Sequence, residues 1–511
     1  MLQRIRHHLV FLLVILLPFH ALFVTLGTKL IEGPGHAPLS SLAIWKEVLM
    51  ALIFLIGIIE IAGVNGKKLF ALVKGRPWNF HLDAPVWCIL GLLFIAFLLI
   101  AGGEPPSFAS FIFGFKYDFV PLIFFLLLAQ LQWDEEFLHS RIFPALLIVG
   151  GIVSLYGIIT LFFPQSFFSF LGYSDAHSLY APGSSLSAFQ QVSDTGIRRI
   201  QSTFSGPNQF GLWLLLPWSI GVVKLLKRFS SSEESAEADD ESRSPSILLR
   251  IGFSTRSAPL RSLEENITLL LTASAIFLTF SRSAWIAAFI IVMVAMGMTQ
   301  KRSALVTRYS LLVTGLLVSV LLIWFISPEL LLRSISNRHH FERTREGIIS
   351  IIQKPFGYGL GSAGPASNRV SDACLYFDDG ADTSWAQDRS DFCLFVGNTQ
   401  VQPTIDQKVC HCPLLPENWY VQIGIELGIF GFAIFLALTF FVLNRLLALR
   451  YTQTFLTFLG ISIAAMFLHA WEDSAIAYTV WGLVGIVLSR RSAHRSLAQG
   501  IMGNRKWNNG G

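Results

Sequence analysis

Residues 416–431, PENWYVQIGIELGIFG, form the junction between a long polar segment and a long apolar one. The apolar segment continues to about residue 443, which is long enough for a helix to cross a hydrocarbon core about 30 Å thick. The polar residues before it would then lie at the membrane surface. We therefore expect the polar chemistry of this chain at the mouth of a helix bundle.

The composition predicts an integral membrane protein. Of the 511 residues, 53% are hydrophobic and only 14% are charged, whereas soluble domains average about 25% charged residues. The apolar residues form blocks that predict an all-α, polytopic bundle of about twelve transmembrane helices. The first block follows MLQRIRHH and is long enough for an uncleaved anchor rather than a signal peptide. The predicted spans are 9–29, 44–64, 84–102, 119–132, 142–163, 207–224, 266–280, 283–299, 309–326, 419–443, 454–470 and 475–489.

Lys and Arg residues set the predicted orientation. They gather after the second, sixth, eighth, tenth and twelfth spans, and the positive-inside rule places that side and both termini in the cytoplasm. The net charge of +5 is then explained by topology, and we expect no nucleic-acid partner. Residues 229–264 would be a disordered cytoplasmic linker, because Ser, Glu and Asp dominate their centre. Residues 164–206 and 327–418 would lie outside, the second as a folded cap between helices 9 and 10.

The predicted cap holds four of the five cysteines, Cys374, Cys393, Cys410 and Cys412. Four thiols in an extracytoplasmic loop indicate two disulfides, for which three pairings are possible. The alternative is a metal site at Cys410-His411-Cys412, although this spacing is not typical of zinc.

Four arginines on the predicted outer side have no topological explanation. Arg198 and Arg199 precede IQSTFSGPNQFG, Arg282 lies in the turn TFSRSAW, and Arg345 lies in the cap. Arginine binds phosphate through two parallel hydrogen bonds, so these side chains would suit the pyrophosphate of a lipid carrier. The alternative is that they contact lipid headgroups or acidic residues.

The segment GYGLGSAG, residues 357–364, lacks the context of a nucleotide-binding loop. We expect a close-approach turn whose backbone N–H groups meet a glycan or a phosphate.

Four motifs occur in the order found in the O-antigen ligase/polymerase superfamily, which the chain resembles over roughly residues 195–440. They are RRIQSTFSGPNQFG, TFSRSAW, TREGIISIIQKPFGYGLG and ENWYVQIGIELGIFG. The resemblance implies a GT-C-like glycosyltransferase of the bacterial inner membrane. It would transfer a glycan from undecaprenyl diphosphate to a glycan, lipid or protein acceptor on the extracytoplasmic face, without a metal or cofactor. The predicted units are residues 1–206, the superfamily-like core 195–443, and 444–511.

Glu417 stands where ligases of this superfamily carry a His at the loop exit. A carboxylate can also accept the proton of an acceptor hydroxyl, so Glu417 is the predicted base and His411 the reserve. Arg282 is predicted to act in catalysis, and Arg198, Arg199, Arg282 and Arg345 to bind the diphosphate. The alternative role for Glu417 is to cap the following helix.

Two other functional classes remain open. A transporter or lipid-glycan flippase also commonly has about twelve spans, but the two halves show no convincing internal repeat. A sensor or assembly scaffold would need no cluster of external arginines.

Overall fold

A computed structural model gives the fold. It describes residues 1–72, 83–102, 107–134, 136–174, 185–188, 190–192, 196–241, 258–299, 334–377, 392–396, 399–400 and 410–489. The chain is mostly helical, as the sequence predicts. Within these residues, seven helical segments are long and apolar enough to span a membrane, namely Leu2–Glu32, Ser40–Gly63, Ala84–Ala101, Phe108–Gln130, Phe137–Phe162, Pro207–Arg228 and Trp419–Ala448.

Most of the remaining predicted spans also coincide with helices. Three shorter apolar helices cover Arg282–Met298, Thr452–Ala464 and Ser474–Ser489. The predicted span 266–280 lies in a helix that begins earlier, at Ala258, and ends at Leu278. The predicted span 309–326 lies outside the described residues, so the count of twelve stays a prediction.

Several spans consist of more than one helical element. The first half of the chain contains α1 (Leu2–Leu16), η1 (Leu17–Phe19), α2 (His20–Glu32), α3 (Ser40–Ala43), α4 (Trp45–Leu72), α5 (Ala84–Ala101), α6 (Phe108–Gly114), η2 (Phe115–Phe119), α7 (Val120–Gln130), η3 (Phe137–Ile142), α8 (Phe143–Ile159), η4 (Thr160–Phe162) and α9 (Gln165–Leu171). The second half contains α10 (Pro207–Trp213), α11 (Leu215–Glu241), α12 (Ala258–Leu278), α13 (Arg282–Thr299), α16 (Ser334–Gln353), α17 (Gly364–Val370), β1 (Ala373–Phe377), β2 (Phe392–Val396), β3 (Thr399–Gln400), α18 (Trp419–Ala448) and α19 (Thr452–Ala464).

Two sequence predictions are corrected here. The predicted span 119–132 begins too late, because the helical segment starts at Phe108 and continues through a π-helical turn that carries Lys116 and Asp118. These charges lower the hydropathy without interrupting the backbone. The predicted disordered linker 229–264 is helical at both ends, since α11 continues to Glu241 and α12 begins at Ala258. Once a helix exists, Ala and Glu extend it readily, and residues 229–241 contain neither Gly nor Pro.

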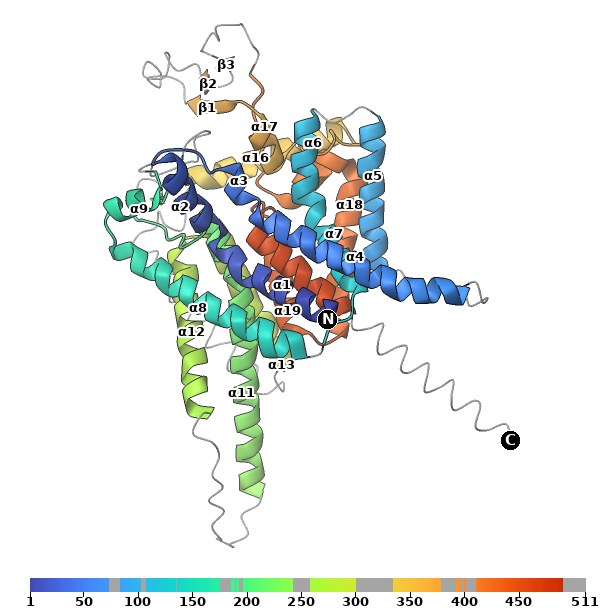
Figure 1. Ribbon diagram of the computed structural model, residues 1–511. Helices are drawn as coiled ribbons and strands as arrows, with labels where there is room; N and C mark the ends of the chain where they lie inside the picture. Colours follow the sequence, from blue (N-terminus) through green and yellow to red (C-terminus); the bar gives the residue numbers. More distant parts are fainter. Residues whose placement is uncertain are drawn as a thin grey trace.

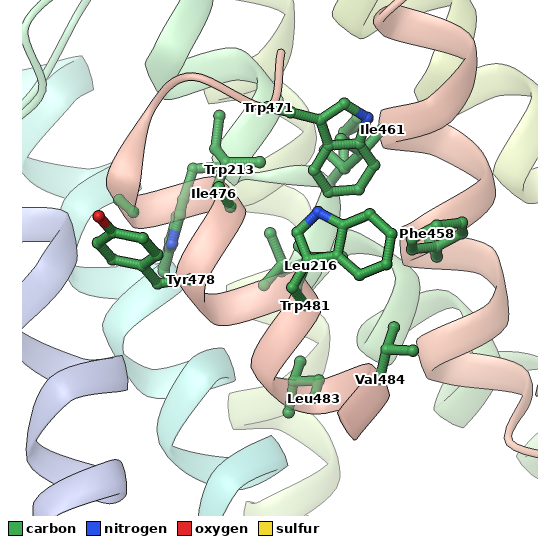
Figure 2. Close-up of a cluster of buried hydrophobic side chains, with 14 of the residues drawn as sticks. Trp213, Leu216, Phe458, Ile461, Trp471, Ile476, Tyr478, Trp481, Leu483 and Val484 are labelled. Carbon is green, nitrogen blue, oxygen red and sulfur yellow. The ribbon is translucent and has the colours of Figure 1, made fainter. Parts of the chain in front are cut away.

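A single hydrophobic cluster joins the N-terminal, middle and C-terminal helices. Its aromatic part is shown in Figure 2, where Trp471 and Trp481 lie beside Phe458, with Trp213 nearby. The ring centroids of Phe458, Trp471 and Trp481 are 5.2–5.3 Å from one another. The three predicted units stay a prediction, and they share this one core.

The segment before α18 lies at one end of the bundle, opposite the end beyond which α11 and α12 extend (Figure 1). In this segment β1 pairs in parallel with β2, and β2 pairs antiparallel with β3. Two disulfides join the strands to the residues that follow, Cys374 to Cys412 and Cys393 to Cys410. One short segment, residues 410–412, is thereby bonded to both β1 and β2.

α18 is interrupted at Gly428, whose φ of 71° is left-handed. The interruption frees backbone groups near the middle of an apolar helix, where they need partners other than water. The segment 355–359 provides them: Tyr358 N–H donates to the Ile425 carbonyl at 2.8 Å, and Gly359 N–H to the Glu426 carbonyl at 3.0 Å. The GYGLGSAG segment is therefore a close-approach turn, and part of its backbone completes the hydrogen bonding of a broken helix.

Candidate functional site

Arg199 is bonded to the turn that leads into Arg282. Its Nε donates to the Thr279 carbonyl at 2.9 Å and its Nη2 to Asn208 Oδ1 at 2.7 Å. Ile200 N–H donates to the Leu278 carbonyl at 3.2 Å. Arg282 begins α13 three residues after Thr279 and is partly buried. The structure thus joins two of the predicted arginine motifs, although they are about 80 residues apart.

The other two predicted arginines have different surroundings. Arg198 Nη1 donates to the Thr160 carbonyl at 3.0 Å, and its guanidinium lies 4.4 Å from the ring centroid of Phe168. This cation–π contact fixes the side chain against α9. Arg345 is exposed on α16.

Glu417 belongs to a group of three ionisable side chains at the loop exit, which we call the loop-exit cluster: His340, Arg343 and Glu417. The Oε2 atom of Glu417 faces Nδ1 of His340, and its Oε1 accepts a hydrogen bond from Nη1 of Arg343. α16 is held in this position because Thr344 Oγ1 donates to the Pro416 carbonyl at 3.2 Å. The arginine that contacts Glu417 is therefore Arg343, whereas the sequence had drawn attention to Arg345.

The loop-exit cluster keeps the Glu417 carboxyl ionised. Burial by itself would raise its pKa, but the hydrogen bond from His340 and the nearby positive charges outweigh burial, and the pKa lies below its usual value. A carboxylate with a lowered pKa is a weaker base, so Glu417 is less suited to accept a proton than an ordinary glutamate. Glu417 is also not the N-cap of α18, because that position belongs to Asn418, whose Oδ1 accepts from Val421 N–H at 3.1 Å.

His411 is exposed, and it is its backbone that pairs with Asp372. The Asp372 N–H donates to the His411 carbonyl at 2.9 Å, and the His411 N–H donates to Asp372 Oδ2 at 2.9 Å. Asp372, Cys393 and Cys410 place possible metal-ligand atoms within 4.8 Å of one another. The two sulfurs are bonded to each other, so neither is a thiolate that could hold a metal ion.

Behind the loop exit lies a buried group that we call the inner carboxylate site: Asp118, Gln422 and Glu426. Glu426 Oε1 accepts from the N–H groups of Gly361 and Ala363 at 3.2 and 3.3 Å. Asp118 Oδ1 accepts a hydrogen bond from Gln422 Nε2 at 3.4 Å, and its carboxyl group lies beside that of Glu426. The backbone N–H groups predicted to meet a phosphate or glycan thus bind a carboxylate of the protein itself.

His469 connects the inner carboxylate site to the turn before the last helix. Its Nδ1 lies 2.7 Å from Gln422 Oε1, and its Nε2 is buried with no hydrogen-bond partner among the described residues. Burial lowers the pKa of His469 to about 4, so the ring is neutral at pH 7. The positive charge next to Glu417 is therefore that of Arg343 and not that of His469. Burial, followed by the neighbouring Asp473, raises the pKa of Glu472 well above its usual value.

A further group of charges surrounds Lys46, which is buried. Its Nζ lies 2.6 Å from His20 Nε2 and 3.8 Å from Glu47 Oε1, while Lys116 Nζ lies 2.8 Å from the same oxygen. Sequence reasoning missed these residues and the inner carboxylate site. The available signal was ionisable residues within otherwise apolar segments, which are functional hypotheses by default.

Left-handed backbone at non-glycine residues occurs near three of these places. Among the described residues it is found at Ser202, Phe280, Glu417 and Arg450, of which Arg450 lies at the opposite end of α18 from Glu417. Ser202 closely follows Arg199, and Phe280 closely precedes Arg282. Such conformations are costly and gather at functional sites, so the backbone gives the arginine motifs and the loop exit a common signature.

No model of a known protein family matches the chain, and neither does any curated protein.

Proposed function

We propose that this chain is a membrane glycosyltransferase of the O-antigen ligase or polymerase type. It moves a glycan from undecaprenyl diphosphate to a glycan, lipid or protein acceptor on the extracytoplasmic face of the bacterial inner membrane. About twelve helices span that membrane, and both termini are cytoplasmic. The observation that carries the proposal is the bonding of Arg199 to the turn that begins α13 with Arg282. Two guanidinium groups are thereby supplied to one end of an apolar bundle.

The chemistry required of these arginines is electrostatic. The diphosphate leaves with additional negative charge when the bond to the anomeric carbon breaks, and a fixed guanidinium stabilises that charge. The backbone acceptor of Arg199 and the ring under Arg198 restrain both side chains before the donor arrives. In this scheme Arg199 and Arg282 hold the diphosphate, and Arg198 supports them from the side of α9.

The test is release of undecaprenyl diphosphate. The purified protein in detergent is incubated with undecaprenyl-diphosphate glycans from its host and a mixture of acceptors, and the released lipid is measured. We expect Arg282→Ala to lower the rate about 100-fold, as loss of one transition-state donor does elsewhere. Arg4→Ala, an exposed arginine near the N-terminus, is the control. Full activity of Arg282→Ala at normal membrane levels would refute the scheme, and product size would separate a ligase from a polymerase.

A second candidate is a lipid-glycan flippase. The observation that favours it is the pair Asp118 and Glu426 inside apolar segments, next to the interruption of α18 at Gly428. Carriers commonly place ionisable groups at broken helices. Movement of the lipid-linked glycan across vesicles, without release of undecaprenyl diphosphate, would favour this function over transfer.

A further inference from the structure

The two oxygens of Glu417 have different partners. Arg343 binds Oε1, and Nδ1 of His340 faces Oε2. His340 and Arg343 lie three residues apart on α16 and so share one face of the helix. The arginine fixes the carboxylate, and the carboxylate in turn fixes the imidazole.

This arrangement determines which imidazole nitrogen carries the proton. Because Nδ1 faces a carboxylate, it holds the hydrogen, and the lone pair of the neutral ring is then on Nε2. The His340 side chain is 37% exposed, against 22% for Glu417. An incoming hydroxyl therefore meets the imidazole more readily than a carboxylate whose two oxygens already have partners.

We propose that His340 is the general base of the transfer reaction and that Glu417 is the residue that positions it. The inference rests on the proposed function. The acceptor hydroxyl gives its proton to Nε2 of His340 as its oxygen bonds to the anomeric carbon. The bond from that carbon to the diphosphate breaks, and its electron pair leaves with undecaprenyl diphosphate. The Glu417 carboxylate stabilises the imidazolium, which afterwards releases its proton to water.

The other histidines near this end of the bundle are less suited to the role. In His469 the free nitrogen is buried and the pKa is lowered to about 4. His411 is paired with Asp372 through its backbone, and no carboxylate contact to its ring is found among the described residues. The titratable groups that face Glu417 are His340 and Arg343 from α16 and the ring of His469, which is neutral at pH 7.

The experiment measures the pH–rate profile of undecaprenyl-diphosphate release for His340→Gln, Glu417→Gln and Glu417→Asp. The control is His36→Gln, because His36 is an exposed histidine whose Nδ1 also lies near a glutamate, 4.0 Å from Glu32. We expect His340→Gln to lower kcat at least about 100-fold with little change in KM for the donor. The pH–rate profile of this variant should lack the acid limb seen in the wild type. Its residual rate should rise when free imidazole is added.

Glu417 should behave as a positioning residue. We expect Glu417→Gln to lower kcat about tenfold with little change in KM for the donor, because the imidazolium formed during the transfer loses its counter-charge. Glu417→Asp should restore part of the lost kcat, which a purely structural role would not produce. His36→Gln should behave as wild type.

Either of two results overturns the assignment. One is wild-type kcat in His340→Gln; the other is a low rate with an unchanged acid limb and no response to imidazole, which indicates a structural role. His340→Asn, checked for normal elution on size exclusion, guards against misfolding of a single variant. Failure of the wild-type protein to release undecaprenyl diphosphate with any acceptor refutes the proposed function, and the inference with it.

Discussion

Replacing Glu426 with Leu should destabilise the bundle far more than replacing it with Gln. Glu426 is fully buried, and its Oε1 accepts two backbone hydrogen bonds, from Gly361 at 3.2 Å and Ala363 at 3.3 Å. Leucine leaves both donors without a partner, at about 1–3 kcal/mol each. Both bonds are long and leucine gains some apolar burial, so we expect a loss of about 3 kcal/mol in unfolding free energy.

The Gln variant separates hydrogen bonding from charge. Its amide oxygen can still accept from Gly361 and Ala363, and its NH₂ group can donate to Asp118. We therefore expect a loss of about 1 kcal/mol or less.

Both variants can be measured by SDS-induced unfolding in mixed micelles, followed through tryptophan fluorescence. Glu346→Leu, at an exposed position on α16, is the matched control and should change little. Equal stability of Glu426→Leu and wild type, or equal losses for Leu and Gln, would show that these backbone bonds do not hold the segment 357–364 to α18.

Three further outcomes follow from the structure. Gly428→Ala should lower the unfolding free energy by more than about 2 kcal/mol in the same assay, since a left-handed backbone alone costs a non-glycine residue about 1–2 kcal/mol and the added Cβ would lie 2.3 Å from the Pro355 carbonyl oxygen. The control is Gly63→Ala, which should be neutral or stabilising because nothing lies within 4 Å of its added Cβ. Lowering the pH from about 6.5 to 4 should reduce the free energy of unfolding, because the unfolded state binds a proton at His469 in that window and the folded state does not. The free energy of unfolding of His469→Asn should depend less on pH over the same range. Reducing the two disulfides, which close loops with sequence separations of 38 and 17 and are worth about 3–4 kcal/mol each, should expose the strands to proteolysis while the SDS unfolding midpoint of the bundle stays unchanged.

The sequence predicted what depends on local pattern. Long apolar runs gave most of the helices, and basic or aromatic residues next to them drew attention to Arg199, Arg282 and Glu417. It did not predict partners, because contacts such as that of Gln422 with Asp118 join residues 304 positions apart. Several alternating polar positions on α16 are equivalent in sequence, so only the docked helix distinguishes Arg343 from Arg345. Cysteine pairing is likewise a property of the folded chain, as four cysteines allow three connectivities.

The hydrogen bonds that join Gly364 to Leu414 and Asp372 to His411 have an evolutionary consequence. Gly364 N–H donates to the Leu414 carbonyl at 2.7 Å, and Asp372 N–H to that of His411 at 2.9 Å. The segment that leaves the helices and the segment that returns to them are thus hydrogen-bonded to each other. The excursion between Asp372 and His411 therefore begins and ends at neighbouring positions. Such an excursion can grow, shrink or be replaced without disturbing the helices beneath it. Under the proposed function, a lineage could therefore adopt a new acceptor by remodelling the excursion while the helices below it are inherited unchanged.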